Sequence, residues 1–234
     1  MPALAAVLFA AACGDDNPTA VDTTAKVRFF NATTGMTGSG GFTTNGQFAS
    51  GSALAFGQST QTCLTVNAGS TSFGFGAANP GGTGLDGLAI ATLNNQNLPA
   101  GGNFTLVTAG STTNATLYLL YNNFSGSLGS DEAAVRFVNL AHGTGASANI
   151  FNVVKGTLGS GSETIFATEV VVGAPTTFAT VTSGSNAFTA LIGHQLPTVT
   201  EISLDLQAGT VNTIAIVPGA TSSGFQLVNI PSCS

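Results

Sequence analysis

The stretch AKVRFFN at residues 25–31 decides the fold of this chain, because it occurs twice. It returns as AAVRFVN at residues 133–139, 108 positions later. LPAG at residues 98–101 likewise returns as LQAG at residues 206–209, again 108 positions later. We therefore predict that the chain contains two copies of one domain.

A third pair of matching segments has a different spacing. TVNAGS at residues 65–70 corresponds to TVTSGS at residues 180–185, at an offset of 115. An offset that grows and then shrinks is expected where loops are lengthened and shortened inside a duplicated fold. Each copy is about 100 residues long, a common domain size that is large enough to bury a core.

The composition excludes some functions. Charged residues make up 6% of the 234 residues, there are four Lys and Arg together, and the net charge is -6. Proteins that bind nucleic acids neutralise phosphates with clustered Lys and Arg. We therefore expect no nucleic-acid partner.

The pattern of apolar residues predicts an all-β protein. No segment keeps a 3.6-residue apolar period over three turns, and Gly or Pro interrupts every long window. Each copy instead reads as seven or eight short strands with turns every 8 to 12 residues, which is typical of two-sheet sandwiches. The expected fold is two tandem immunoglobulin-like antiparallel β-sandwich domains.

Three local patterns support particular strands. Asn45-Gly46 is the preferred pair for a type I′ turn, so residues 41–48 are predicted to form a hairpin. We predict a second hairpin from residues 62–66 and 72–75, turning at residues 67–70. Residues 200–206 alternate apolar and polar side chains most clearly, with the apolar ones facing inward.

The first residues resemble an export signal. Residues 3–12 form an apolar run that is too short to span a bilayer and ends in small residues before Cys13. Small residues followed by cysteine resemble the processing site of bacterial lipoproteins, in which Cys13 would carry the lipid. The alternative is an ordinary secretory signal followed by a chance cysteine.

The predicted organisation follows from these features. It consists of a signal peptide (1–12), a tether (13–24), a first sandwich (25–121), a Gly/Ser-rich linker (122–132) and a second sandwich with a C-terminal tail (133–234).

If Cys13 carries lipid, Cys63 and Cys233 remain as an even pair. In an exported protein such a pair can form a disulfide. A bond between them would pin the tail onto the first copy and lock the two copies together. The alternative is two free thiols.

The repeated motifs resemble a known family. The Val-Arg-Phe-x-Asn strand, the turn of Val-x-Ala-Gly type and the Leu-x-Ala-Gly turn before a Thr/Val-rich strand are similar to the bacterial surface domain called domain of unknown function 4397. The resemblance extends over nearly all of both copies and implies exported β-sandwiches in tandem. It supplies no catalytic residues.

Few residues suggest chemistry. His142 and His194 have no acid or Cys within a few residues, whereas a zinc site needs three or four ligands, so we interpret both as exposed loop residues. A carboxylate pair for glycoside hydrolysis would come from Asp86, Glu163, Glu169, Glu201 and Asp205. Glu201 and Asp205 lie on one strand roughly 13 Å apart, too far for that reaction. We expect no enzyme, no cofactor and no metal.

Arg28 and Arg136 occupy equivalent positions and are half of all basic residues. One interpretation is a repeated contact with an anion or carboxylate. The other, which we favour, is that each arginine stem covers the sheet and each head pairs with an acid or with the domain junction.

The sequence therefore predicts an exported, non-catalytic cell-surface or periplasmic lipoprotein, anchored at the outer membrane or cell surface, with a structural or adhesive role. Its partners would be the membrane and a surface polysaccharide or protein. One alternative is a carbohydrate or small-ligand binding module, although the chain lacks Trp and its two Tyr, Tyr118 and Tyr121, share one strand. Another is a self-assembling filament or surface-layer subunit, because strands with few charges protect their edges weakly.

Overall fold

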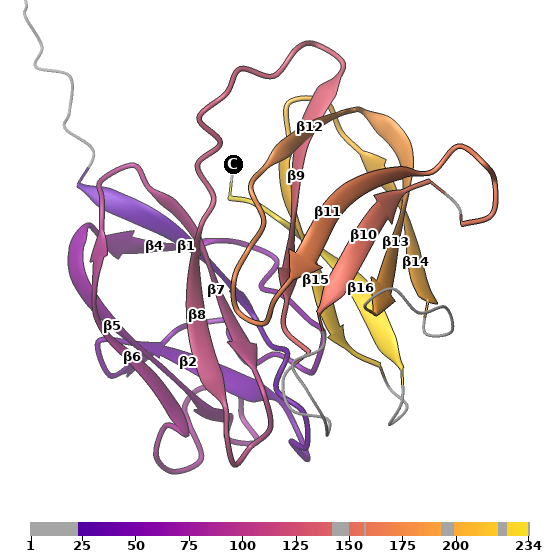
Figure 1. Ribbon diagram of the computed structural model, residues 1–234. Coiled ribbons are helices and arrows are strands. Elements are labelled where there is room, and N and C mark those ends of the chain that lie inside the picture. The colour runs from indigo at the N-terminus through magenta and orange to yellow at the C-terminus, as the bar shows by residue number, and fades with distance from the viewer. Residues whose placement is uncertain (1–22, 142–149, 157, 193–198, 220–223, 234) are drawn as a thin grey trace, which may run out of the picture.

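The computed structural model describes residues 23–141, 150–156, 158–192, 199–219 and 224–233 (Figure 1). Within these ranges the chain forms strands and no helix, in agreement with the predicted all-β class. The first half contains β1 (Thr24–Phe30), β2 (Gly40–Thr44), β3 (Gln47–Phe48), β4 (Leu64–Asn67), β5 (Gly69–Ala77), β6 (Ala91–Leu98), β7 (Asn103–Ala109) and β8 (Thr116–Tyr121). The second half contains β9 (Glu132–Asn139), β10 (Phe151–Lys155), β11 (Thr164–Val170), β12 (Ala179–Thr182), β13 (Gly184–Ile192), β14 (Val199–Leu206), β15 (Val211–Pro218) and β16 (Phe225–Pro231).

Each half is built from two four-stranded sheets. The strand orders are β4-β1-β7-β8 and β3-β2-β5-β6 in the first half, and β12-β9-β15-β16 and β11-β10-β13-β14 in the second. Each strand number in the first half corresponds to the number eight higher in the second. The two halves therefore share one topology.

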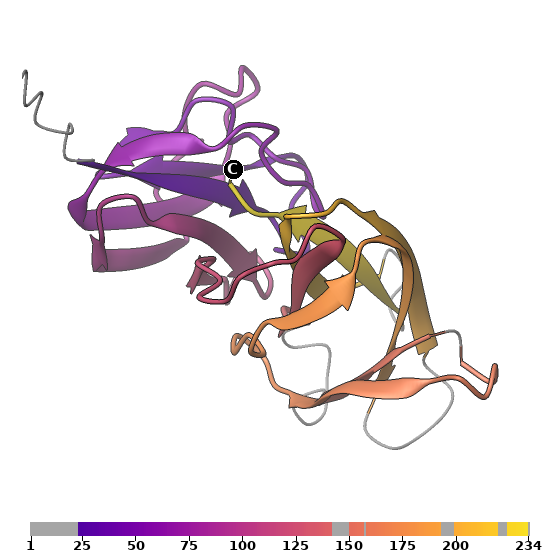
Figure 2. The same ribbon diagram turned by 90° about the horizontal axis from the view of Figure 1, so that it is seen from above.

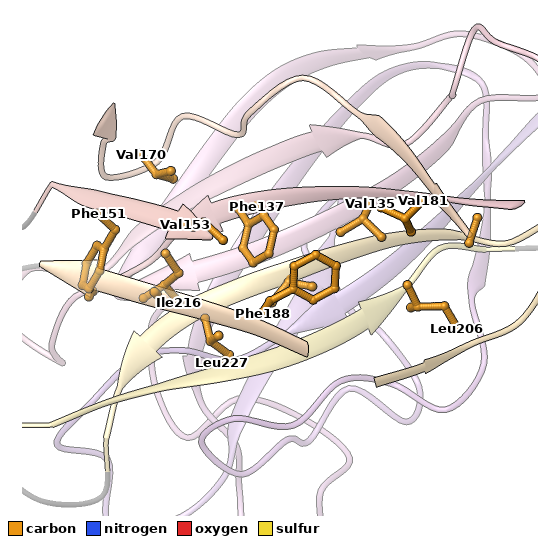
Figure 3. Packing of buried hydrophobic residues seen from close by; sticks show 14 residues of the cluster. Val135, Phe137, Phe151, Val153, Val170, Val181, Phe188, Leu206, Ile216 and Leu227 are labelled. Atoms are coloured by element: carbon orange, nitrogen blue, oxygen red, sulfur yellow. The ribbon is translucent and has the colours of Figure 1, made fainter. Parts of the chain in front are cut away.

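An aromatic-rich core fills the space between the two sheets of each half. In the first half, Phe42 of β2 lies between Phe29 of β1 and Phe75 of β5, with 4.9 Å between ring centroids in both pairs. In the second half, Phe137 of β9 packs edge-on against Phe188 of β13 at 5.4 Å (Figure 3). Burying these rings removes a large apolar area from water, which is the main driving force for closing the sheets on each other.

The prediction that every sheet is antiparallel was wrong for two of the four sheets. β1 pairs parallel with β7, with Val27 opposite Phe104, and β9 pairs parallel with β15, with Phe137 opposite Ile214. Parallel neighbours need a long connection between them. In the first half, β2 to β6 connect β1 to β7, and in the second half, β10 to β14 connect β9 to β15.

One predicted hairpin is confirmed and the other was wrong. β2 and β3 turn at Asn45 and Gly46, both with positive φ (49° and 76°), as a type I′ turn requires. β4 and β5 do not pair with each other, because β4 pairs with β1 while β5 pairs with β2 and β6. The turn at Gly69 (φ 107°) thus carries the chain from one sheet to the facing one. A short glycine turn looks the same in sequence in both cases.

The alternation predicted for residues 200–206 is confirmed along β14. Ile202, Leu204 and Leu206 pack on the core of the second half, while the residues between them are exposed. No helix able to cross a membrane is found in the described part of the chain.

Candidate functional site at the junction of the two halves

A third apolar core joins the two halves. Its buried members alternate along their strands with residues of the two inner cores, so they lie on the opposite faces of the same sheets: Phe30, Ala32, Val107, Ala109 and Leu120 from the first half, and Val138, Leu140, Ala215, Val217 and Ile230 from the second. The central strands are consequently buried on both faces. The two halves therefore pack on each other as one body (Figure 1).

A disulfide crosses this junction. Cys63, just before β4, is bonded to Cys233, just after β16, with 5.9 Å between the two Cα atoms. Figure 2 shows the segment after β16 running from the second half back toward the first. The bond predicted from the cysteine count is thus present in the structure, and it ties the tail to the first half.

Arg136 of β9 reaches across the junction. Its Nη1 donates to the carbonyl oxygen of Tyr121 at 2.9 Å, and its Nη2 donates to Oδ1 of Asn122 at 2.6 Å. Its Nε donates to the hydroxyl of Thr213 at 3.0 Å, and the ring of Phe178 lies 4.5 Å from the guanidinium carbon. Burial lowers the pKa of Arg136 to about 10. All three nitrogens of this guanidinium are therefore satisfied by neutral groups.

Arg28 of β1 has the equivalent position but a different environment. Its side chain is 9% exposed, and its Nη1 donates to the carbonyl oxygen of Thr60 at 2.5 Å and more distantly to that of Gln61 at 3.5 Å. Its Nε has no hydrogen-bond partner among the described residues. Burial also lowers the pKa of Arg28. In the described part of the chain, neither arginine is paired with an acid, one of the two kinds of partner expected from the sequence.

A pocket of about 770 Å³ opens beside Arg28, between the two halves. The first half contributes Arg28, the start of β7 and the residues after β8, and the second half contributes the ends of β14 and β16 and the start of β15. Its lining is rich in Asn and Gln side chains and includes the disulfide residue Cys233. The volume lies within the range of small-molecule sites, about 300–1,000 Å³.

Other residues singled out from the sequence lie elsewhere. Cys13, His142 and His194 are outside the described residues. Within the described ranges, no group of three or more His, Cys, Asp or Glu side chains gathers as a metal site would require. Tyr118 packs on the junction core, and Tyr121 is 47% exposed with its ring 5.1 Å from Phe104. The two tyrosines therefore do not form one flat aromatic platform.

Sequence reasoning missed the residues that distinguish the two arginines. Asn122 was assigned to the linker, yet it is 3% exposed and contacts Arg136. Ser232 was assigned to the tail, yet it lines the pocket. Their common position, one residue after β8 and one residue after β16, marks them as equivalent but does not indicate a contact with either arginine.

Comparisons with known proteins identify the family. A model of the family described as domain of unknown function (DUF4397) matches residues 25–147, which is more than half of the chain. The chain belongs to this family. The match covers the first half and β9, whereas the sequence resemblance was expected over nearly all of both copies. The DUF4397 description names no function.

Other comparisons add little to the family assignment. No curated protein matches the chain. Among solved structures, a leucine-rich repeat protein from Bacteroides thetaiotaomicron aligns with 80% of this chain at 10% identity and a TM-score of 0.21. The aligned region spans a quarter of that protein's length. A likeness this weak carries no argument about fold or function.

Proposed function

We propose that this chain is a non-catalytic exported protein of the cell envelope with a structural or adhesive role. In this proposal two immunoglobulin-like sandwiches of the same family stand in tandem, and a lipid on Cys13 anchors them to the outer membrane or cell surface. The observation that carries the proposal is the Cys63–Cys233 disulfide. Structural disulfides persist in oxidising compartments and are rare in the cytosol.

The junction supports a mechanical part of this role. Residues from both halves share one apolar core, Arg136 bridges the halves through neutral oxygens, and the disulfide ties the end of the second half to the first. Domains with small polar interfaces move relative to each other, whereas a large apolar interface fixes them. The two halves thus present their outer loops at a fixed separation, as a surface spacer or adhesin requires.

The anchor is tested by metabolic labelling. The full chain is expressed in a bacterial host that processes lipoproteins, with labelled palmitate in the medium. We expect label in the wild type, no label in Cys13→Ser, and retained label in Cys63→Ser, which removes a different cysteine. An unlabelled wild-type protein, or equal labelling of Cys13→Ser, would refute lipidation of Cys13.

One rival function is that of a filament or surface-layer subunit. Such a subunit would form ordered polymers, which light scattering and negative-stain imaging of protein beginning at Asp15 would detect. A monomer in both measurements removes this rival. A small-ligand binding function is favoured by one observation, the pocket beside Arg28.

A further inference from the structure

The strand positions around the two arginines correspond one to one, although their hydrogen-bond partners differ. Arg28 lies opposite Thr105 in the β1–β7 pair, as Arg136 lies opposite Thr213 in the β9–β15 pair. The last strands also correspond, because Tyr121 pairs with Phe104 in the first half and Pro231 pairs with Asn212 in the second. The residue after each strand is therefore equivalent too. Asn122 ends the first copy, and Ser232 ends the second.

At Arg136, groups of the chain itself accept the hydrogen bonds of the guanidinium. Arg136 directs Nε and Nη2, the two donors on one edge of its fork, at the hydroxyl of Thr213 and the amide oxygen of Asn122. A carboxylate presents two oxygens to arginine in this same side-by-side manner. Thr213 and Asn122 thus supply the two oxygens that a bound carboxylate would otherwise supply.

At Arg28, the corresponding edge of the guanidinium makes no hydrogen bond to a described residue. The hydroxyl of Thr105 accepts from Nδ2 of Asn122 at 2.7 Å, and no described residue accepts a hydrogen bond from Nε or Nη2 of Arg28. Ser232 stands where Asn122 would be expected, but a serine hydroxyl lies one bond closer to the backbone than an asparagine amide oxygen. Oγ of Ser232 is itself buried without a partner in the described structure.

In the described part of the chain, most of the buried polar atoms without a partner belong to residues that line the pocket. Among the described residues, four buried side-chain polar atoms have no hydrogen-bond partner, and three of them belong to residues that line this pocket: Arg28 Nε, Asn229 Oδ1 and Ser232 Oγ. Buried polar groups are satisfied in almost all native structures, so these atoms call for an explanation. The residues of this pocket thus carry a cationic donor, an acceptor and a hydroxyl whose hydrogen bonds a ligand can complete.

We propose that this pocket binds an acidic sugar, with its carboxylate on the free edge of Arg28. The arginine edge selects an anion with two coplanar oxygens. Oδ1 of Asn229 needs a donor, which a sugar hydroxyl provides, and Ser232 can donate to or accept from a second hydroxyl. Asp205 also lines the pocket, but it is exposed, so solvent and salt screen its charge. Binding of an acidic sugar in this pocket does not require that the protein is anchored at the cell surface.

The chain suits a direct spectroscopic test, because Arg28 and Arg136 are its two arginines. In a nitrogen–proton correlation spectrum their Nε–H groups give two signals, and Arg136 serves as an internal control. The folded protein is titrated with glucuronate, with glucose and acetate as matched probes that lack the carboxylate and the sugar ring, respectively. We expect glucuronate to shift the Arg28 signal with saturation, to leave that of Arg136 in place, and to bind more tightly than glucose or acetate.

Two variants sharpen the test. Arg28→Lys keeps the charge without the planar fork and should weaken glucuronate binding about tenfold or more. Ser232→Asn keeps Arg28 and adds an amide oxygen equivalent to that of Asn122, so it should fill the vacant edge and abolish binding while the protein stays folded. An unshifted Arg28 signal in the wild type, glucose or acetate binding as tightly as glucuronate, or unchanged glucuronate affinity in folded Ser232→Asn would each overturn the proposal.

Discussion

Removing the Cys63–Cys233 disulfide tests how the two halves are held together. The bonded residues are 170 positions apart, so the bond closes about three quarters of the 234-residue chain into one loop. In the chain-entropy model, a loop of this size restricts the unfolded chain by about 5 kcal/mol at 25 °C. Measured losses usually fall below this limit because unfolded chains retain some structure. We expect the Cys63→Ser, Cys233→Ser double variant to lose about 2–5 kcal/mol of unfolding free energy.

The assay is urea unfolding followed by circular dichroism, with and without a reducing agent. Reduction should destabilise the wild type by the same amount as the double substitution, and it should leave the double variant unchanged. The apolar junction core should keep the unfolding of the reduced protein a single transition. A loss below about 1 kcal/mol would refute the loop-closure reasoning. Two separate transitions after reduction would show that the disulfide, and not the apolar core, couples the halves.

Two further predictions concern the same junction and are checked by urea unfolding. Phe30→Ala should cost about 3–5 kcal/mol, because the ring is fully buried between the halves. Leu88→Ala, at a side chain that is 91% exposed, should change stability by no more than about 0.5 kcal/mol, and equal effects of the two would contradict the junction core. Gly173→Ala should destabilise by more than the roughly 1–3 kcal/mol of backbone strain at positive φ, because its Cβ would also lie 2.2 Å from a ring carbon of Tyr118. Gly159→Ala has a similar φ and open space around the new Cβ, so a loss equal to that of Gly173→Ala would refute the clash.

Local patterns in the sequence predicted individual strands well. The strand that Tyr118 and Tyr121 were expected to share is β8, and the turn at Asn45 and Gly46 follows from the φ values those residues tolerate. The wrong predictions concern which strands pair with each other. The turn at Gly69 is correctly a turn, but the strands on its two sides pair in different sheets. Local backbone preferences are the same for a hairpin turn and for a turn between two sheets. The competition between distant strands for backbone partners decides which strands pair.

The candidate site shows the same division. The repeat placed Arg28 and Arg136 at equivalent positions, and the cysteine count paired Cys63 with Cys233. The different surroundings of the two arginines depend on Asn122 and Ser232, each of which follows the last strand of its own copy. Nothing in the local sequence shows that these ends lie beside buried guanidinium groups, because the packing of one half on the other brings them there.

The sequence by itself determined the all-β class and the inward face of β14, because these depend on residue periodicity and turn chemistry over a few neighbours. It also contained the duplication pattern and the cysteine pair. The tertiary structure alone decided that the second face of the central strands is buried as well, between the halves. Phe30 and Val138 look like outward residues when one sheet is considered alone. Only the approach of the other half removes them from water and leaves a pocket beside Arg28.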